Sequence, residues 1–174
     1  GDVYKRQAER NYYTLVTSGM GAHRMNVPKE LAEYKLERAE IVVYLPADWN
    51  ISDHEEKNYW PLRWLKILAR LPLEEDSWLG WGHSVPNGKP FAENTQLSSV
   101  LLINPENVEE GAAVCQLPNG EEVNFYQMIP LYEEEVNFKI QNGAETLLGK
   151  MGEISAVVDI HRLNVCEGFG RPKE

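Results

Sequence analysis

WLGWGHSVPNGKPFAENT, residues Trp78 to Thr95, combines two tryptophans with three glycines, two prolines and His83. No regular helix or strand suits that mixture, because glycine adopts backbone angles that other residues avoid and proline fixes φ and lacks an N–H. Large aromatic rings in an irregular stretch indicate a structured loop packed on a core, and such loops often carry function. The segments on either side must therefore supply the regular elements of the fold.

These flanking segments show strand and helix patterns. β-branched and aromatic runs predict strands at 11–17, 40–45, 96–103, 112–117 and 122–129, and Asn119-Gly120 between the last two indicates a hairpin. Apolar residues three and four apart predict the main helix at 60–71, with Pro61 in its first turn and Pro72 at its end. Further helices are predicted at 131–141 and 144–151, with one helical turn at 29–34. The order indicates an α+β fold, a single domain in which helices pack against a mixed, largely antiparallel sheet.

Two stretches near the C-terminus have weaker patterns. Residues 154–160 are apolar with β-branching and fit either a strand or a helix. The tail after Cys166 is predicted to be loose.

Composition restricts the function classes. The 174 residues carry a formal charge of −10 and are 43% hydrophobic, typical of one soluble globular domain. Without a basic patch, a nucleic-acid partner is not expected. No apolar run approaches the roughly 20 residues that cross a bilayer, and no signal peptide is visible. Two widely spaced cysteines, Cys115 and Cys166, agree with a reducing compartment, so the predicted location is the cytoplasm.

The first seven residues have a separate origin in our interpretation. Asp2 to Gln7, DVYKRQ, is the translation of a common sequencing-adapter end. We therefore predict that residues 1–7 are an artefact and that the domain occupies 8–174, with its core at about 12–151.

Catalytic and metal-binding patterns are weak. One hypothesis makes the chain a hydrolase-type enzyme in which His83 works with Glu93 or Asp76 as acid and base. However, no serine or cysteine nucleophile motif accompanies His83, and the four histidines lack ligand spacing. Gly80 and Gly82 form a GxG without the third glycine of a dinucleotide loop. We therefore expect no enzyme, no cofactor and no metal.

Aromatic and acidic residues provide candidates for a partner surface. Trp60 and Trp64 share one helix face and are expected in the core. Trp78 and Trp81 are equally compatible with packing and with an interface, where tryptophan is enriched. Glu133 and Glu134 belong to an acidic run that suits a solvated helix start or a basic partner. The predicted partner-binding residues are Trp78, Trp81, His83, Asn87, Glu133 and Glu134.

Several blocks together resemble the suppressor-of-fused (SUFU) domain family in its bacterial, single-domain form. The blocks are SGM (18–20), MNVP (25–28), EIVVYLPADW (40–49), WPLRWLKILARLP (60–72), WLGWGHSVPNGKPF (78–91), SVLLINP (99–105) and FYQMIPLYEEE (125–135). The resemblance implies a non-enzymatic protein-binding module. Animal members regulate hedgehog signalling and hold a transcription-factor peptide between two domains as an added strand. A counterpart of the second domain is not found here, so that ligand and its site are not carried over.

Two functions follow from the resemblance. Bacterial relatives are proposed to be immunity proteins that neutralise a cognate toxin, and a basic toxin domain would suit this acidic chain. The alternative is an intracellular regulator or adaptor that binds an endogenous peptide by strand addition.

Overall fold

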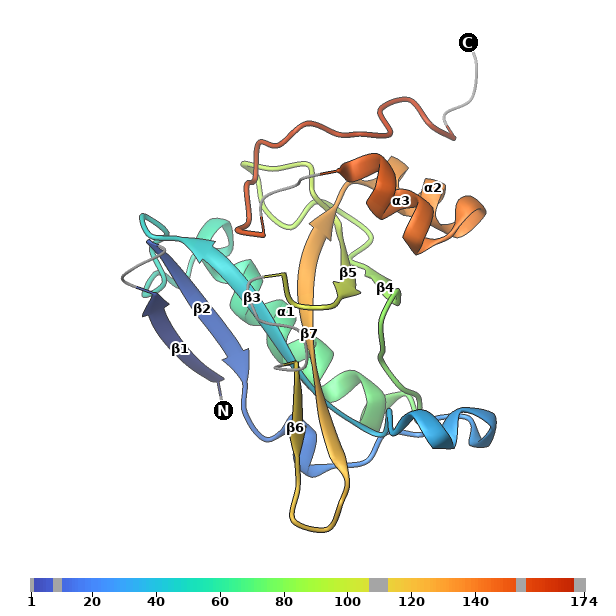
Figure 1. The fold of residues 1–174 in the computed structure, drawn as a ribbon. Coiled ribbons are helices and arrows are strands. Elements are labelled where there is room, and N and C mark those ends of the chain that lie inside the picture. Colours follow the sequence, from blue (N-terminus) through green and yellow to red (C-terminus); the bar gives the residue numbers. More distant parts are fainter. Residues whose placement is uncertain (1, 8–10, 107–112, 153–155, 171–174) are drawn as a thin grey trace.

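The computed structural model describes residues 2–7, 11–106, 113–152 and 156–170 (Figure 1). Its strands are β1 (Asp2–Gln7), β2 (Tyr12–Thr17), β3 (Arg38–Pro46), β4 (Ser84–Pro86), β5 (Ser99–Ile103), β6 (Val114–Gln116) and β7 (Glu122–Leu131). Its α-helices are α1 (Glu56–Glu74), α2 (Glu133–Asn142) and α3 (Ala144–Met151), and the 3-10 helices are η1 (Met20–Ala22) and η2 (Lys29–Tyr34). The predicted α+β class is confirmed.

The strands form one seven-stranded mixed sheet in the order β1-β2-β3-β7-β5-β4, with β6 beside β7. Among the strands that the structure describes, β3 and β7 form the one parallel pair, which ends at Val42 and Gln127. Beyond that point β7 continues alongside β5, from Gln127 to Leu131. The long strand β7 therefore joins the two parts of the sheet.

Successive side chains of β5 and β7 pack alternately into two cores, because neighbouring residues of a strand face opposite sides of the sheet. Val100, Leu102 and Met128 belong to the core that includes the α1 residues Trp60 and Leu65. On the opposite face, α2 and α3 cover the ends of β5 and β7. Leu101, Ile103, Ile129, Leu131, Val136, Leu147 and Met151 are the main residues of this second core. Burial on both faces explains why β5 reads as a continuous apolar run.

The main helix α1 extends beyond its predicted bounds at both ends. It begins at Glu56, four residues early, where Asp53 accepts hydrogen bonds from the Glu55 N–H and the Asn58 amide. Pro61 consequently lies in the second turn, not the first. Pro72 was predicted to end the helix, which instead continues to Glu74. A proline removes one N–H bond and crowds the carbonyl four residues before it. Only two residues of α1 follow the buried Pro72, and the Glu75 N–H bond to the Leu71 carbonyl, at 2.9 Å, closes the last turn.

The remaining bounds differ by a few residues. β5 begins at Ser99 and not at 96, while β7 passes through Pro130 to Leu131 and α2 begins at Glu133. Ala112, the first residue of one predicted strand, lies outside the described residues. So do residues 154 and 155 of the stretch 154–160, whose described part forms a single parallel bridge between Val157 and Tyr44.

Residues 2–7 form β1, which pairs with β2 in antiparallel fashion. Their origin in a sequencing adapter stays a prediction. Resequencing the source gene across codons 1–8 checks it, and an authentic upstream run encoding the same residues would contradict it.

Candidate partner-binding site

The loop 78–95 packs against the sheet and contributes the short strand β4 to it. Around β4, Gly82 N–H donates to the Leu102 carbonyl at 2.7 Å, and Leu102 N–H donates to the His83 carbonyl at 2.9 Å. Gly82 has φ +82°, and a Cβ placed there would lie 3.5 Å from the Ala144 Cβ on α3. The loop is therefore held between β5 and α3, which confirms the prediction of a packed loop.

Trp78 and His83 pack against each other within this loop. Their ring centroids lie 4.4 Å apart in an edge-on arrangement, and Trp78 is half-buried against the α1 core. The Gly80 N–H donates to His83 Nδ1 at 3.2 Å. Burial, and then the positive charge of Lys139, lowers the pKa of His83, against a smaller opposite effect of the Trp78 backbone. His83 is therefore a neutral, structurally bonded imidazole near pH 7.

The carboxylates predicted to assist His83 lie elsewhere. Asp76 hydrogen-bonds to the Asn26 amide. Glu93 lines a different hollow, together with His161 and Tyr132. The hypothesis of a hydrolase centred on His83 therefore lacks the base-orienting contact that it requires.

Trp81 differs from its neighbours because it is 42% exposed. It stands at the rim of a hollow of about 220 Å³ at the open end of the second core. The other lining residues are Ile103, Asn104, Glu106, Ile129, Leu148, Met151 and Gly152. Burial raises the pKa of the Glu106 carboxyl in this mostly apolar setting. An exposed tryptophan beside an apolar hollow with a few polar groups is a typical anchor point for another protein.

Glu106 is held in place through the backbone. The buried Gln127 side chain accepts a hydrogen bond from the Glu106 N–H at 3.0 Å and donates to the Ala156 carbonyl at 2.9 Å. Sequence analysis did not single out Glu106 or Gln127. Gln127 lies in the block FYQMIPLYEEE and Glu106 directly follows SVLLINP, but nothing in either block pairs the two residues, which meet because β5 and β7 are neighbours.

The other predicted contact residues are spread out. Asn87 is half-buried in a turn and donates to the Lys89 carbonyl at 2.8 Å. Glu133 is exposed at the start of α2, whereas Glu134 is only 8% exposed. The expectation of a solvated acidic run was wrong for Glu134 and Glu135, because the C-terminal tail covers them. Of the six predicted residues, Trp81 and Glu133 offer the most accessible side chains.

The tail after Cys166 was predicted to be loose, but up to Gly170 it packs on α2. The Gly168 N–H donates to Glu134 at 3.4 Å, and the Phe169 ring lies edge-on against Phe138 with centroids 5.2 Å apart.

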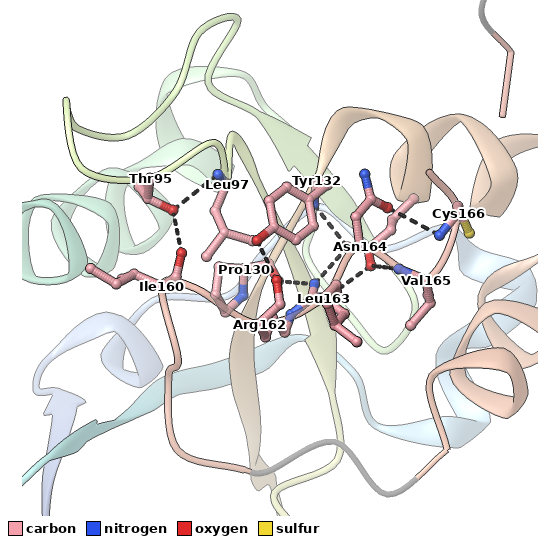
Figure 2. A network of polar contacts seen from close by, with 11 residues as sticks. Thr95, Leu97, Pro130, Tyr132, Ile160, Arg162, Leu163, Asn164, Val165 and Cys166 are labelled. Atoms are coloured by element: carbon pink, nitrogen blue, oxygen red, sulfur yellow. Dashed lines mark hydrogen bonds and ion pairs between the residues drawn. The ribbon is translucent and has the colours of Figure 1, made fainter. Parts of the chain in front are cut away.

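The part of the C-terminal tail before Cys166 is fastened as well. Figure 2 shows Arg162 at the centre of a polar network beside Pro130 and Tyr132. Arg162 donates to the fully buried Glu135 at 2.7 and 2.5 Å and to the Pro130 carbonyl at 2.9 Å. The Tyr132 hydroxyl donates to the Arg162 carbonyl at 2.5 Å. The tail is thus fastened across the end of β7, where β3 and β7 have separated.

The described residues show neither a metal-binding cluster nor a membrane-spanning helix. Over 2–7, 11–106, 113–152 and 156–170, no three His, Cys, Asp or Glu side chains gather as a metal site would require. None of the helices in these ranges has the length and apolar character of a membrane span.

Comparison with known proteins decides the family. The family model of the suppressor of fused protein (SUFU) matches residues 2–163. This chain belongs to the SUFU family. The SUFU match covers both the Trp81 loop and Arg162, so the site described above lies wholly inside the family domain.

Relatives of this SUFU domain come from bacteria and animals. It is 29% identical to the uncharacterized protein UU111 of Ureaplasma parvum, over 92% of this chain and 76% of that one. A SUFU homolog of Neisseria gonorrhoeae has a similar structure, with TM-score 0.64 and 19% identity over 92% of this chain and 74% of that one.

Two solved structures of Sufu proteins share the fold at 14% identity. One is the Sufu–Fu complex, with TM-score 0.65 over 95% of this chain and 76% of that one. The other is Drosophila Suppressor of Fused, with TM-score 0.66, of which this chain spans 42%. At this level of identity the likeness establishes the fold.

Proposed function

We propose that this SUFU domain is a non-enzymatic, cytoplasmic protein-binding module whose contact surface centres on Trp81. The observation that carries the proposal is the half-exposed indole at the rim of the 220 Å³ hollow. Burying a tryptophan in an interface contributes more to affinity than most other contacts. The relative solved in complex with Fu is itself bound to a protein.

The most concrete form of this function is bacterial immunity, in which the domain covers the active face of a cognate toxin. The net charge of −10 supports a basic toxin domain as the partner, because opposite charge accelerates encounter. Glu133 is exposed and Glu106 lies beside Trp81, so both can meet cationic groups. Co-expression with the toxin encoded by the neighbouring gene tests this role, and failure to bind or neutralise that toxin would remove it.

Trp81→Ala should weaken binding to the partner without destabilising the domain. Loss of an interface anchor costs about 2 kcal/mol or more, which is roughly a 30-fold rise in Kd. The melting temperature should stay nearly unchanged, because substitutions of exposed side chains have small effects on stability. Calorimetric titration and thermal unfolding of the same variant measure both quantities.

The matched control is Tyr34→Ala on η2, which removes another exposed aromatic ring, 59% exposed, away from the hollow. Its Kd should equal that of the unmodified protein. If Trp81→Ala and Tyr34→Ala bind equally well, the contact surface lies elsewhere.

A second candidate is the regulator or adaptor that binds an endogenous peptide by strand addition. The position of β4 favours this role, because β4 is the edge strand at one end of the sheet. It begins at Ser84, only three residues after Trp81. However, β4 has three residues and includes Pro86, features that limit strand addition at an edge. Hydrogen exchange should show new protection in β4 if a peptide pairs there, and a pull-down that returns only toxin domains would argue against this role.

A further inference from the structure

Lys139 on α2 is a half-buried cation that forms no ion pair with the residues the structure describes. Its ammonium donates to the Ser84 hydroxyl at 3.1 Å, which uses one of three N–H donors. Among the described residues, no carboxylate lies within ion-pair distance of Lys139, although the chain has 27 acidic residues. A partly buried charge normally has a partner of opposite sign. This exception needs a physical explanation.

The helix position of Lys139 explains it only in part. A cation in the last turn of a helix is favoured by the helix dipole. However, the Lys139 ammonium donates its hydrogen bond to the Ser84 hydroxyl on β4, which belongs to the sheet and not to α2. Burial also lowers the pKa of Lys139, so this position costs the ammonium part of its hydration.

Ser84 and its neighbour His83 follow Trp81 in the stretch GWGHS (80–84), but neither belongs to the hollow at Trp81. Ser84 and His83 are both half-buried. Three groups surround His83. Lys139 of α2 lies on one side, and the Trp78 ring and backbone and the Gly80 N–H come from the same loop as His83. Within the described part of the chain, Lys139 is the charged group that acts on His83.

We propose that Lys139 and Ser84 form a binding site for a small oxyanion, a carboxylate or a phosphate, with His83 beside it. The ammonium has two free N–H donors, and the hydroxyl can turn its hydrogen toward an anion. Hydrogen bonds between an ammonium and an oxyanion are among the stronger kinds in proteins. The bound anion supplies the negative charge that the described residues do not place within ion-pair distance of Lys139. The site is independent of any protein partner.

The anion and His83 are coupled through charge. A negative group near His83 favours the imidazolium, so occupancy raises the pKa of His83 from its lowered value. By linkage, the affinity for the anion increases as the pH falls through the pKa of His83. A site built from Lys139 alone would show no such dependence below neutral pH.

Proton NMR of the His83 ring tests the proposal, with His83→Gln identifying its signal among the four histidines. The full chain is titrated with sodium phosphate and, separately, with sodium acetate, against sodium chloride at equal ionic strength. We expect a saturable shift of the His83 signal and a higher pKa of His83 with at least one oxyanion. Saturation by phosphate alone assigns a phosphate ligand, saturation by acetate alone assigns a carboxylate, and saturation by both assigns a general oxyanion site.

Lys139→Met should weaken this binding about tenfold or more, because it removes the charged donor. Lys150→Met is the matched control. Lys150 is an exposed lysine on α3 that lies over the Phe138 ring of α2, so its replacement should leave the titration unchanged. Ser84→Ala provides a second, smaller loss if Lys139→Met unfolds. An absence of saturation beyond chloride, or an equal affinity in the Lys139 and Lys150 variants, overturns the proposal.

Discussion

Glu135→Ala is expected to lower the free energy of unfolding by about 3–5 kcal/mol, the usual cost of removing one partner of a buried ion pair. The Glu135 side chain is fully buried, and that of Arg162 is 10% exposed. Besides Arg162, the Glu135 carboxylate accepts hydrogen bonds from the backbone N–H groups of Tyr132 and Val165, at 2.8 and 3.1 Å. The substitution therefore leaves a buried guanidinium uncompensated and two donors without their acceptor.

Urea unfolding measures this effect, and Glu133→Ala is its control. Glu133 lies in the same helical turn but is exposed, so its replacement should change the free energy of unfolding by no more than about 0.5 kcal/mol. The double variant Glu135→Ala, Arg162→Ala should lose less than the sum of the two single losses, because it leaves no buried charge alone. Equal losses for Glu133→Ala and Glu135→Ala would show that the tail is not fastened through this pair.

The predictable part of the fold is the part specified by local pattern. The strand at Tyr12–Thr17, the hairpin at Asn119-Gly120 and the helix at Ala144–Met151 follow from residue types over short windows. The C-terminal end of α1 was predicted too early because Pro72 is a strong local stop signal. Packing of the Pro72 ring in the core outweighs one missing hydrogen bond.

The tail and the Trp81 hollow depend on residues far apart in sequence. Arg162 and Glu135 are 27 residues apart and meet only after β7, α2 and α3 are in place. Likewise, Trp78 and Trp81 have similar sequence surroundings, yet Trp78 packs against the α1 core and Trp81 is exposed in the turn closed by the His83 N–H bond to the Gly80 carbonyl. No local sequence pattern distinguishes the packed tryptophan from the exposed one, so packing and partner binding were both compatible with the sequence of either residue.

Trp60→Ala is the second substitution with a large expected effect, a loss of about 3–5 kcal/mol in the free energy of unfolding. The Trp60 ring is 1% exposed and stacks on Phe91, with centroids 4.5 Å apart and planes 4° apart. Trp49 contacts it edge-on at 6.1 Å. Because Phe91 belongs to the loop 78–95, truncating Trp60 should also loosen the loop that carries Trp81.

Trp60→Phe separates the aromatic packing from the indole nitrogen. Among the buried side chains that the structure describes, Trp60 Nε1 has no hydrogen-bond partner. Phenylalanine keeps most of the stacking on Phe91 and removes an unpaired buried donor, whose desolvation costs about 1–3 kcal/mol. Trp60→Phe should therefore be clearly less destabilising than Trp60→Ala. Trp81→Ala should be the least destabilising of the three, because it truncates an exposed indole. Chemical unfolding of the three variants gives the order, and a loss for Trp81→Ala as large as that for Trp60→Ala would mean that Trp81 is a core residue and not a surface for a partner.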